Sequence, residues 1–513
     1  MTIEPLVERA ATSTVASLFA ARARVHPTRA ALEDAERILT YAAVDGRTGQ
    51  LAAELASLGV AKGERVAILS ENRIEYLEVF LAAAKLGAVV ACQNCRLAPA
   101  ELTHCLDLVS PSCILVSPRH EDKLARLGRK EATITLGSDY EARLARHPTA
   151  PPLATLDPED PLLILYTSGT TGLPKGAVLS HRAETVRNLV IRAEFGIASE
   201  DAFAAWSPLY HMGAAEWSLG ALLSGGTVVV VDGFDRVRLA EIVETRALGW
   251  LLLMPGMVGA FAEELRRRGT RPRGVKVCGV MADLVPPAEI AEITRLLGAP
   301  YANTFGATET GCPPCSSNVI PVGVAPTRLS KEQSPYCEVR LVDPEDHDVP
   351  DGSPGELCMR GPTLFSGYWR APEANAHDFR GGWFHMGDVF VRNPDGTLDF
   401  VDRVKYLIKT GGENVYPAEI ERVLLQDARV ADAAVVRKRD AKWGEVPVAF
   451  VARRDESLTA DELRARCRAA LAGYKQPKEI RFIPFDAFPR SASGKVQRHE
   501  LEKRLDAPEE ESP

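Results

Sequence analysis

The sequence predicts an α/β protein with a large N-terminal domain of α/β subdomains plus a small β-barrel-like subdomain, followed by a small mobile α+β C-terminal domain. The chain of 513 residues is long enough for more than one hydrophobic core. As far as about residue 315, strand-like apolar runs alternate with helical stretches, a pattern typical of parallel sheets. From 335 to 404 short strands with Gly and Asp turns dominate, which indicates a small antiparallel sheet or barrel.

The elements follow in order along the chain. Residues 15–60 predict a helix, a short strand pair and a second helix, and GERVAILSENRIEYLEVFLAAAKLGAVVA predicts a strand, a helix and a strand. A Pro-rich linker covers residues 146–161, and the alternation resumes through LLSGGTVVVVDGF and ALGWLLLMPGMV. A charged, mixed α/β stretch follows residue 404, and the acidic tail DAPEEESP is expected to be disordered. We therefore expect one domain over residues 1–404 and another over 405–513.

The composition argues against a nucleic-acid-binding, membrane-embedded or secreted protein. The net charge of −8 offers no general attraction to nucleic acid or to an anionic membrane, so positive charge for anionic ligands has to be local. No apolar run reaches the length of a membrane span, and the N-terminus lacks the apolar core of a secretory signal. We expect a cytoplasmic protein with no integral membrane association and no nucleic-acid partner; monomer and homodimer remain open.

The ten cysteines are expected to be reduced. Cys92 and Cys95, and Cys312 and Cys315, have the CxxC spacing of a zinc ribbon, but more than two hundred residues separate the two pairs. Cysteines in a chain of this kind are usually small buried hydrophobic residues. We therefore favour buried thiols over structural zinc.

The stretch YTSGTTGLPKGAVLSH predicts a phosphate-binding loop between two buried strands. Glycines let the backbone approach an anion, backbone N–H groups and hydroxyls donate to it, and Lys175 adds a positive charge. It is not a Walker A loop, because the required second glycine falls on Pro174 and Lys175 is followed by Gly176. A surface hairpin is the structural alternative.

Five motifs in order make the chain resemble the acyl-adenylate-forming superfamily, which contains acyl-CoA synthetases, aryl-CoA ligases, adenylation domains and firefly luciferase. They are YTSGTTGLPKG, FGATET, GWFHMGD, VDRVKYLIKTGGENVYPAEIE and PRSASGKVQR. The resemblance covers nearly the whole chain and implies ATP, Mg²⁺ and CoA as reactants or cofactors. The nucleotide-binding residues that it implies are Thr167, Ser168, Gly169, Thr170, Thr171, Gly172, Lys175, Asn303, Thr304, Phe305, Gly306, Thr308, Asp388 and Arg403.

The resemblance also assigns catalytic roles. Lys495 would bridge the substrate carboxylate and the α-phosphate, and Glu309 with Thr167 would hold Mg²⁺. His211 would lie beside the acyl channel. Each residue has a structural alternative. Lys495 could be a solvated lysine, Glu309 a loop acid and His211 a structural imidazole. Asp388 could cap a turn, and Arg403 could pair with Asp402.

The middle of the chain is expected to form an apolar acyl pocket without an obvious charge partner. Its predicted residues are His211, Met212, Trp217, Met254, Cys278, Met281, Gly311 and Cys312. Two segments depart from the family pattern: VMADL stands where relatives have a Gly-Gly-Ala-Pro-like turn, and APTRLSKEQSPYCEV replaces a Gly-Ser-Val-Gly-like segment. Phe305 stands where relatives often have Tyr.

We therefore expect an ATP-dependent acyl-CoA synthetase that forms an acyl-AMP with release of pyrophosphate and then transfers the acyl group to CoA. The C-terminal domain would rotate about Lys405, presenting Lys495 first and then the CoA-side residues Gly411, Gly412, Glu413 and Asn414. Two alternatives remain open: a ligase that loads an acyl-carrier protein, and a catalytically silent binder of nucleotide or acyl-adenylate. The sequence does not identify the carboxylic acid. SPLYHMGAAEWSLG has no Asp to pair with an α-ammonium, which disfavours an amino acid, although Glu216 in the same stretch leaves an amino acid open.

Overall fold

The computed structural model describes residues 10, 12–147, 154–168, 173–411, 413–490 and 496–505. Contacts within the chain group it into a larger unit, Met1–Val339 with Met359–Trp383, and a smaller unit, Arg340–Cys358 with Phe384–Pro513. These units interleave along the sequence, and the expected domain boundary at residues 404 and 405 stays a prediction. The tail from residue 506 onwards lies outside the described residues.

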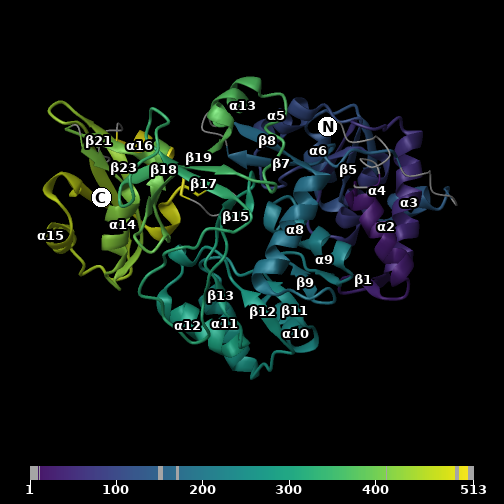
Figure 1. Ribbon diagram of the computed structural model, residues 1–513, viewed down its shortest axis with the longest axis horizontal. Coiled ribbons are helices and arrows are strands. Elements are labelled where there is room, and N and C mark those ends of the chain that lie inside the picture. Colours follow the sequence, from purple (N-terminus) through teal and green to yellow (C-terminus); the bar gives the residue numbers. More distant parts are fainter. Residues whose placement is uncertain are drawn as a thin grey trace. The chain divides into compact units, whose positions relative to one another are not determined.

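A six-stranded sheet forms one half of the larger unit (Figure 1). Its first five strands are parallel to one another, and β8 returns antiparallel to β7. The strands are almost entirely apolar because helices cover a sheet of this kind on both faces. The strands in spatial order are β6 (Ala132–Thr135), β5 (Cys113–Val116), β3 (Arg65–Leu69), β4 (Val89–Cys92), β7 (Pro161–Ser168) and β8 (Pro174–Ser180).

An eight-stranded sheet forms the other half of the larger unit. Its six central strands are parallel, and the strand at each edge is antiparallel to its neighbour. The strands in spatial order are β16 (Val319–Ile320), β13 (Tyr301–Ala302), β12 (Val275–Cys278), β11 (Leu248–Leu251), β9 (Ala202–Ala205), β10 (Val228–Val230), β1 (Ala30–Glu33) and β2 (Ile38–Thr40). A hairpin of β14 (Phe305–Ala307) and β15 (Gly311–Cys315) follows β13.

Helices connect these strands, and the local sequence marks their ends. The hydroxyl of Ser180 accepts from the N–H of Ala183 and begins α8, and Gly196 in the left-handed conformation ends it. The helices of the larger unit are α2 (Val15–Val25), α3 (Tyr41–Ser57), α4 (Ile74–Leu86), α5 (Pro99–Val109), α6 (Glu121–Ala125), α7 (Ser138–Leu144), α8 (His181–Phe195), α9 (Met212–Ser224), α10 (Arg236–Thr245), α11 (Val258–Arg268), α12 (Pro287–Leu297) and α13 (Pro372–Asp378).

The described residues of the smaller unit form two sheets and three α-helices. A four-stranded sheet has the order β17 (Glu338–Val342), β18 (Pro354–Arg360), β19 (Phe384–Arg392) and β20 (Leu398–Arg403). A five-stranded sheet runs β22 (Glu413–Val415), β21 (Ile408–Thr410), β24 (Gly444–Arg453) and β23 (Val430–Asp440), with β25 (Glu479–Phe482) also paired to β24. The helices are α14 (Pro417–Leu425), α15 (Ala460–Ala470) and α16 (Arg498–Leu505).

The predicted α/β fold class is confirmed, including the parallel sheets and the later antiparallel strands. All ten cysteines lie in the described part of the chain, and eight of them are buried. No helix in the described part of the chain is long and apolar enough to cross a membrane.

Candidate active site

Strands β7 and β8 carry the ends of the predicted phosphate loop. Their antiparallel register pairs Thr167 with Lys175, and Ser168 with Pro174. The side chain of Ser168 and all of Gly169, Thr170, Thr171 and Gly172 lie outside the described residues. The register thus places Thr167 and Lys175 at the base of the loop, as a phosphate site between two strands requires.

Tyr368 links two of the predicted site residues in the larger unit. The Lys175 ammonium lies 4.4 Å from the centroid of the Tyr368 ring and 3.6 Å from Asp378 Oδ2. The Tyr368 hydroxyl donates to Glu309 Oε1 at 2.9 Å. Lys175 and the half-buried Glu309 therefore share one aromatic neighbour, although they are far apart in sequence.

Backbone pairing holds Tyr368 in this position. The N–H of Trp369 donates to the carbonyl of Gly176, and the N–H of Val178 donates to Gly367, so this segment lies along β8. The Asn375 side chain on α13 bonds both the N–H and the carbonyl of Tyr368. The sequence analysis missed Tyr368; its signal is an aromatic residue in SGYWRAP, next to a glycine and shortly before a proline.

The FGATET motif forms the tight hairpin of β14 and β15. Asn303 and Thr304 are buried just before it, Phe305 and Thr308 are half-buried, and the motif brings Glu309 to the turn. A Cβ on Gly306 would lie 1.9 Å from the Gly311 carbonyl oxygen, so the hairpin requires glycine there.

The predicted acyl pocket lies where neighbouring parallel strands of the eight-stranded sheet end. Strands β9, β11, β12 and β13 are adjacent and parallel. They lead respectively to His211, Met254, Met281 and Asn303. The carboxyl ends of such strands are the usual ligand site in open α/β sheets. The topology therefore brings pocket residues from separate parts of the sequence to one edge.

Within this region the described side chains are a mixture of packed and accessible groups. Trp217 on α9 is buried and stacks on Trp250 with ring centroids 4.0 Å apart. Cys278 and Cys312 are buried, and Gly311 has a φ of 77°. His211 and Met212 begin α9 and are half-buried, as are Met254 and Met281.

Met281 has a backbone conformation that is unusual for its residue type. Its φ is 49°, in the left-handed region that favours glycine. The preceding Gly279 lies against the Tyr301 ring, which a Cβ on that glycine would approach to 2.0 Å, and the Tyr301 hydroxyl donates to the Val280 carbonyl at 3.0 Å. The turn is therefore fixed by its surroundings, which hold Met281 in a strained conformation.

The acyl pocket was expected to have no obvious charge partner. This expectation needs a correction, because buried charged residues lie beside the hairpin of β14 and β15. Arg187 on α8 forms a buried ion pair with Glu216 on α9 and donates from Nη1 to the Thr308 carbonyl at 3.1 Å. Glu184, one turn before Arg187, is also buried, and burial raises the pKa of its carboxyl well above the usual range. Glu216 already has an arginine partner, which weakens its candidacy for binding a substrate ammonium.

In the smaller unit, the ribose motif pairs with the start of the predicted hinge. Asp388 on β19 lies opposite Arg403 on β20, and Arg403 Nε is 2.9 Å from Asp388 Oδ1. The alternative pairing of Arg403 with Asp402 is not formed between side chains. Instead, Asp402 accepts from the backbone N–H groups of Arg403 and Ala418, and burial raises its pKa.

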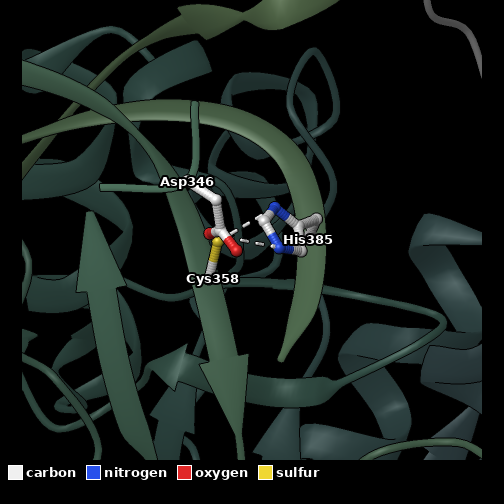
Figure 2. Close-up of side chains that lie close together, drawn as sticks. All are labelled: Asp346, Cys358 and His385. Atoms are coloured by element: carbon white, nitrogen blue, oxygen red, sulfur yellow. Dashed lines mark hydrogen bonds and ion pairs between the residues drawn. The ribbon is translucent and has the colours of Figure 1, made fainter. Parts of the chain in front are cut away.

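A cluster of side chains fixes β19 just before Asp388 (Figure 2). His385 Nδ1 lies 3.1 Å from Glu356 Oε2 and 3.2 Å from Cys358 Sγ, and His385 Nε2 lies 3.7 Å from Asp346 Oδ1. Glu356 also accepts from the N–H of Gly387 at 3.0 Å, so it bonds residues on both sides of Met386. Glu356 was not among the residues predicted from the sequence; it is the one acid in the strand PGELCMR.

Asp346, Cys358 and His385 are also ligand types that bind zinc, and they form the one such group found among the described residues. Neither CxxC pair belongs to it. Because Glu356 bonds both His385 and the N–H of Gly387, the residue before Asp388, we assign the cluster to the support of the ribose motif.

The predicted hinge and CoA-side residues lie at the surface of the smaller unit. Lys405 is exposed in a short turn, and its carbonyl accepts from Arg437. Gly411 has a φ of 59°, and a Cβ there would lie 2.8 Å from the Trp443 ring. Glu413 and Asn414 are exposed on β22, and Gly412 lies outside the described residues.

Lys495 also lies outside the described residues. The structure does describe the residues on either side of the segment 491–495. Arg490 and Val496 form an antiparallel bridge on either side of residues 491–495. Arg498, the first residue of α16, then forms a two-pronged ion pair with Glu421 on α14, with Nη2 at 2.8 and 2.7 Å from the two carboxylate oxygens. The Arg498 guanidinium also stacks 4.4 Å from the Tyr406 ring centroid.

We expect Arg498→Met to lower the free energy of unfolding by about 3 kcal/mol, because it leaves the buried Glu421 carboxyl without its partner. Urea denaturation of the full chain measures this loss. Arg464→Met, which removes an exposed arginine from an ion pair with Asp461 on α15, should cost less than about 1 kcal/mol. Equal losses in the two variants would contradict a structural role for the buried pair.

Comparison with known proteins agrees with this arrangement. The model of the AMP-binding enzyme family matches residues 19–369, and that of the AMP-binding enzyme C-terminal domain matches 419–495. Feruloyl-CoA synthase from Amycolatopsis is 34% identical over 490 residues, covering 94% of this chain and 97% of the relative. Indoleacetate–CoA ligase from Aromatoleum aromaticum is 34% identical over 495 residues, covering 93% and 96% respectively.

A solved structure extends the similarity to the fold. The o-succinylbenzoate CoA synthetase of Bacillus subtilis, in complex with its acyl-adenylate intermediate, has a TM-score of 0.83 and 26% identity, covering 94% of this chain and 97% of that one. The two family models match in the order in which the motifs occur along the chain. The chain therefore belongs to the AMP-binding enzyme family and has the fold of its acyl-CoA synthetases.

Proposed function

We propose an aromatic carboxylic acid as the substrate of this AMP-forming CoA ligase. The observation that carries the proposal is that the near-full-length relatives described above are named for ferulate, indoleacetate and succinylbenzoate, all of which contain an aromatic ring. The predicted pocket is compatible with a flat ring, since apolar Met281 and Met254 and the aromatic Trp217 are among its residues.

The reaction has two balanced steps. In the first, a carboxylate oxygen of the acid attacks the α-phosphorus of ATP, and the bond from that phosphorus to the bridging oxygen breaks to release pyrophosphate. In the second, the CoA sulfur attacks the acyl carbon, the bond to AMP breaks, and the thiol proton is lost. Lys175 at the base of the phosphate loop supplies positive charge for the first step, and Lys495 is proposed to follow the charge as it moves to pyrophosphate.

Mg²⁺ is the metal that ATP chemistry implies, and Glu309 fits it. Its carboxylate is half-buried, and Tyr368 donates to Oε1 and so orients the group. Carboxylate oxygens are the protein ligands that Mg²⁺ uses most, together with phosphate oxygens and water. We propose Glu309 and Thr167 as its holders. Asp388 and Arg403 are proposed to bind the ribose, with Asp388 accepting from its hydroxyls.

Two assays test the function. Pyrophosphate exchange without CoA, across aromatic, linear fatty and alicyclic acids, measures adenylation and should be fastest with aromatic acids. Thioester formation is then followed with CoA and, separately, with a carrier protein that bears pantetheine. Preference for the carrier would favour a carrier-loading ligase, and no exchange with any acid would indicate a silent binder. Exchange confined to fatty acids would contradict the aromatic proposal.

We expect Met281→Gly to change the ranking of acids in the pyrophosphate assay more than it changes the dependence on ATP. The φ of 49° is one that glycine adopts freely, so the change removes the side chain without straining the turn. Each methylene-sized group removed from apolar contact is worth about 0.8 kcal/mol, enough to shift the preference among acids several-fold.

Ser110→Gly is the matched control for the Met281 variant. Ser110 also has a positive φ, 46°, but it is exposed at the end of α5. The Ser110→Gly variant should leave the ranking of acids unchanged. If Met281→Gly instead preserves the ranking and weakens ATP binding, Met281 packs against the adenine and specificity lies elsewhere.

A further inference from the structure

Lys331 is a charged residue in an unusual place. Its exposed fraction is 0%, and lysine is almost never fully buried unless it is paired. Lys85, at 6%, is the other buried lysine in the described part of the chain. Lys85 pairs with Asp45, which lies on α3, and neither residue is a predicted site residue. The surroundings of Lys331 are different.

Both partners of Lys331 come from segments of the predicted active site. The Lys331 ammonium lies 2.7 Å from Asp283 Oδ2 and donates to Asn303 Oδ1 at 2.8 Å. Asp283 follows β12 in the turn that Met281 begins, and Asn303 follows β13 immediately before the FGATET hairpin. One ammonium therefore joins a predicted pocket segment to the predicted nucleotide motif.

The segment that carries Lys331 is itself held against the same region. The amide of Asn303 donates to the Ser330 carbonyl at 2.9 Å, and Asn318 donates to that carbonyl at 3.0 Å. Further along, the Ser334 hydroxyl donates to Glu194 on α8. Lys331 is thus anchored on both sides, and its position does not depend on the ion pair alone.

This contact explains two departures of the sequence from its family together. Asp283 belongs to VMADL and Lys331 to TRLSKEQSPYC, the two segments that differ from the usual text. A buried ammonium without a partner would be costly, and Asp283 supplies the negative charge that balances Lys331. One departure thus supplies the partner that the other requires.

We propose that Lys331 is a specificity-determining positioning residue: through Asp283 it fixes the turn that carries Met281, and so sets which acids fit the pocket. The geometry supports this link, because Asp283 is two residues from Met281 and the N–H of Leu284 closes the same turn on the Met281 carbonyl at 3.0 Å. The inference rests on the proposed function, since it assigns the control of acid selection within that same reaction.

The test compares Lys331→Met with Lys85→Met in the full-length enzyme. Both changes remove a buried, paired ammonium and leave an unbranched apolar side chain that is one atom shorter. We expect Lys331→Met to raise KM for the preferred acid about tenfold and to reorder the acids, with KM for ATP changed less than about twofold, because one buried charge contact is worth about that much. Lys85→Met should lower thermal stability without reordering the acids.

Asp283→Asn gives a second route if Lys331→Met does not fold, because Asp283 is 34% exposed and the change keeps its shape. It should reorder the acids in the same direction. In the double variant the two effects should be clearly less than additive, as expected for residues in direct contact.

The proposal is overturned if Lys331→Met and Asp283→Asn keep the wild-type order of acids, or if their effects are additive. The wild-type panel separates this result from failure of the proposed function. If the wild type prefers fatty acids, the aromatic proposal fails, and the order of those acids still tests Lys331. Binding of acyl-sulfamoyl adenosine analogues, measured by calorimetry, gives the same ranking if the wild type turns over no acid.

Discussion

We expect Lys495→Ala to reduce acyl-AMP formation by about 100- to 1000-fold while leaving the conversion of supplied acyl-AMP to acyl-CoA largely intact. Removing one preorganised group that stabilises developing charge typically costs this much. The charge that Lys495 is proposed to stabilise moves from the attacking carboxylate to pyrophosphate, and pyrophosphate has already left before the thioester step begins. The loss should therefore be confined to the first half-reaction.

The two half-reactions are measured separately, by pyrophosphate release and by CoA consumption from synthetic acyl-AMP. Lys503→Ala is the matched control, because Lys503 lies on the adjoining helix α16, is 69% exposed and pairs with Glu500. It should leave both rates unchanged. Equal loss of both half-reactions in Lys495→Ala would count against this role of Lys495. It would also count against separate roles for Lys495 and the CoA-side residues of the C-terminal domain.

The fold was predictable because its elements carry strong local signals. The helix at α4 and the strands on either side of it follow from the apolar runs VAIL, VFLAAA and AVVA, with Gly87 in the left-handed conformation where the helix ends. Likewise, β18, β19 and β20 follow from short β-rich runs between Gly and Asp turns. The order of strands within a sheet has no such signal, because it depends on contacts between distant segments.

Site residues could be predicted where they belong to a contiguous sequence motif. They could not be predicted where the fold brings in a residue from a distant segment. FGATET and GWFHMGD identify Glu309 and Asp388 as candidates from the sequence alone. Tyr368, which bonds Glu309, belongs to no motif considered and reaches it through pairing with β8. Glu356 supports the strand of Asp388 in a similar way from a neighbouring strand.

Ion pairs between distant residues also could not be predicted from the sequence. Arg187 and Glu216 are separated by 29 positions, and Lys331 and Asp283 lie in different segments. An isolated charged residue in a sequence is usually solvated, so burial of Arg187, Glu216 and Lys331 could not be inferred before their partners were known. The departures at VMADL and TRLSKEQSPYC were visible, but their connection required the fold.

We expect Glu309→Gln to slow acyl-AMP formation by about 100-fold, with partial recovery as Mg²⁺ is raised. Glutamine keeps the size of the side chain and a carbonyl oxygen that can accept from the Tyr368 hydroxyl, so the hydrogen bond seen here survives while the negative charge is lost. A metal contact that contributes about 3 kcal/mol to the first step corresponds to this factor, since each 1.36 kcal/mol is tenfold in rate.

Tyr368→Phe separates charge from orientation. It retains the ring beneath the Lys175 ammonium and removes the hydroxyl that orients Glu309. Because the carboxylate keeps its charge, the loss should be smaller, about tenfold, and Mg²⁺ should restore more of the rate. Titration of Mg²⁺ at saturating acid, with ATP binding followed by calorimetry, distinguishes the two variants. If Glu309→Gln leaves both the rate and the Mg²⁺ dependence unchanged, the carboxylate serves only as an acceptor for Tyr368, and the metal must be held by other groups.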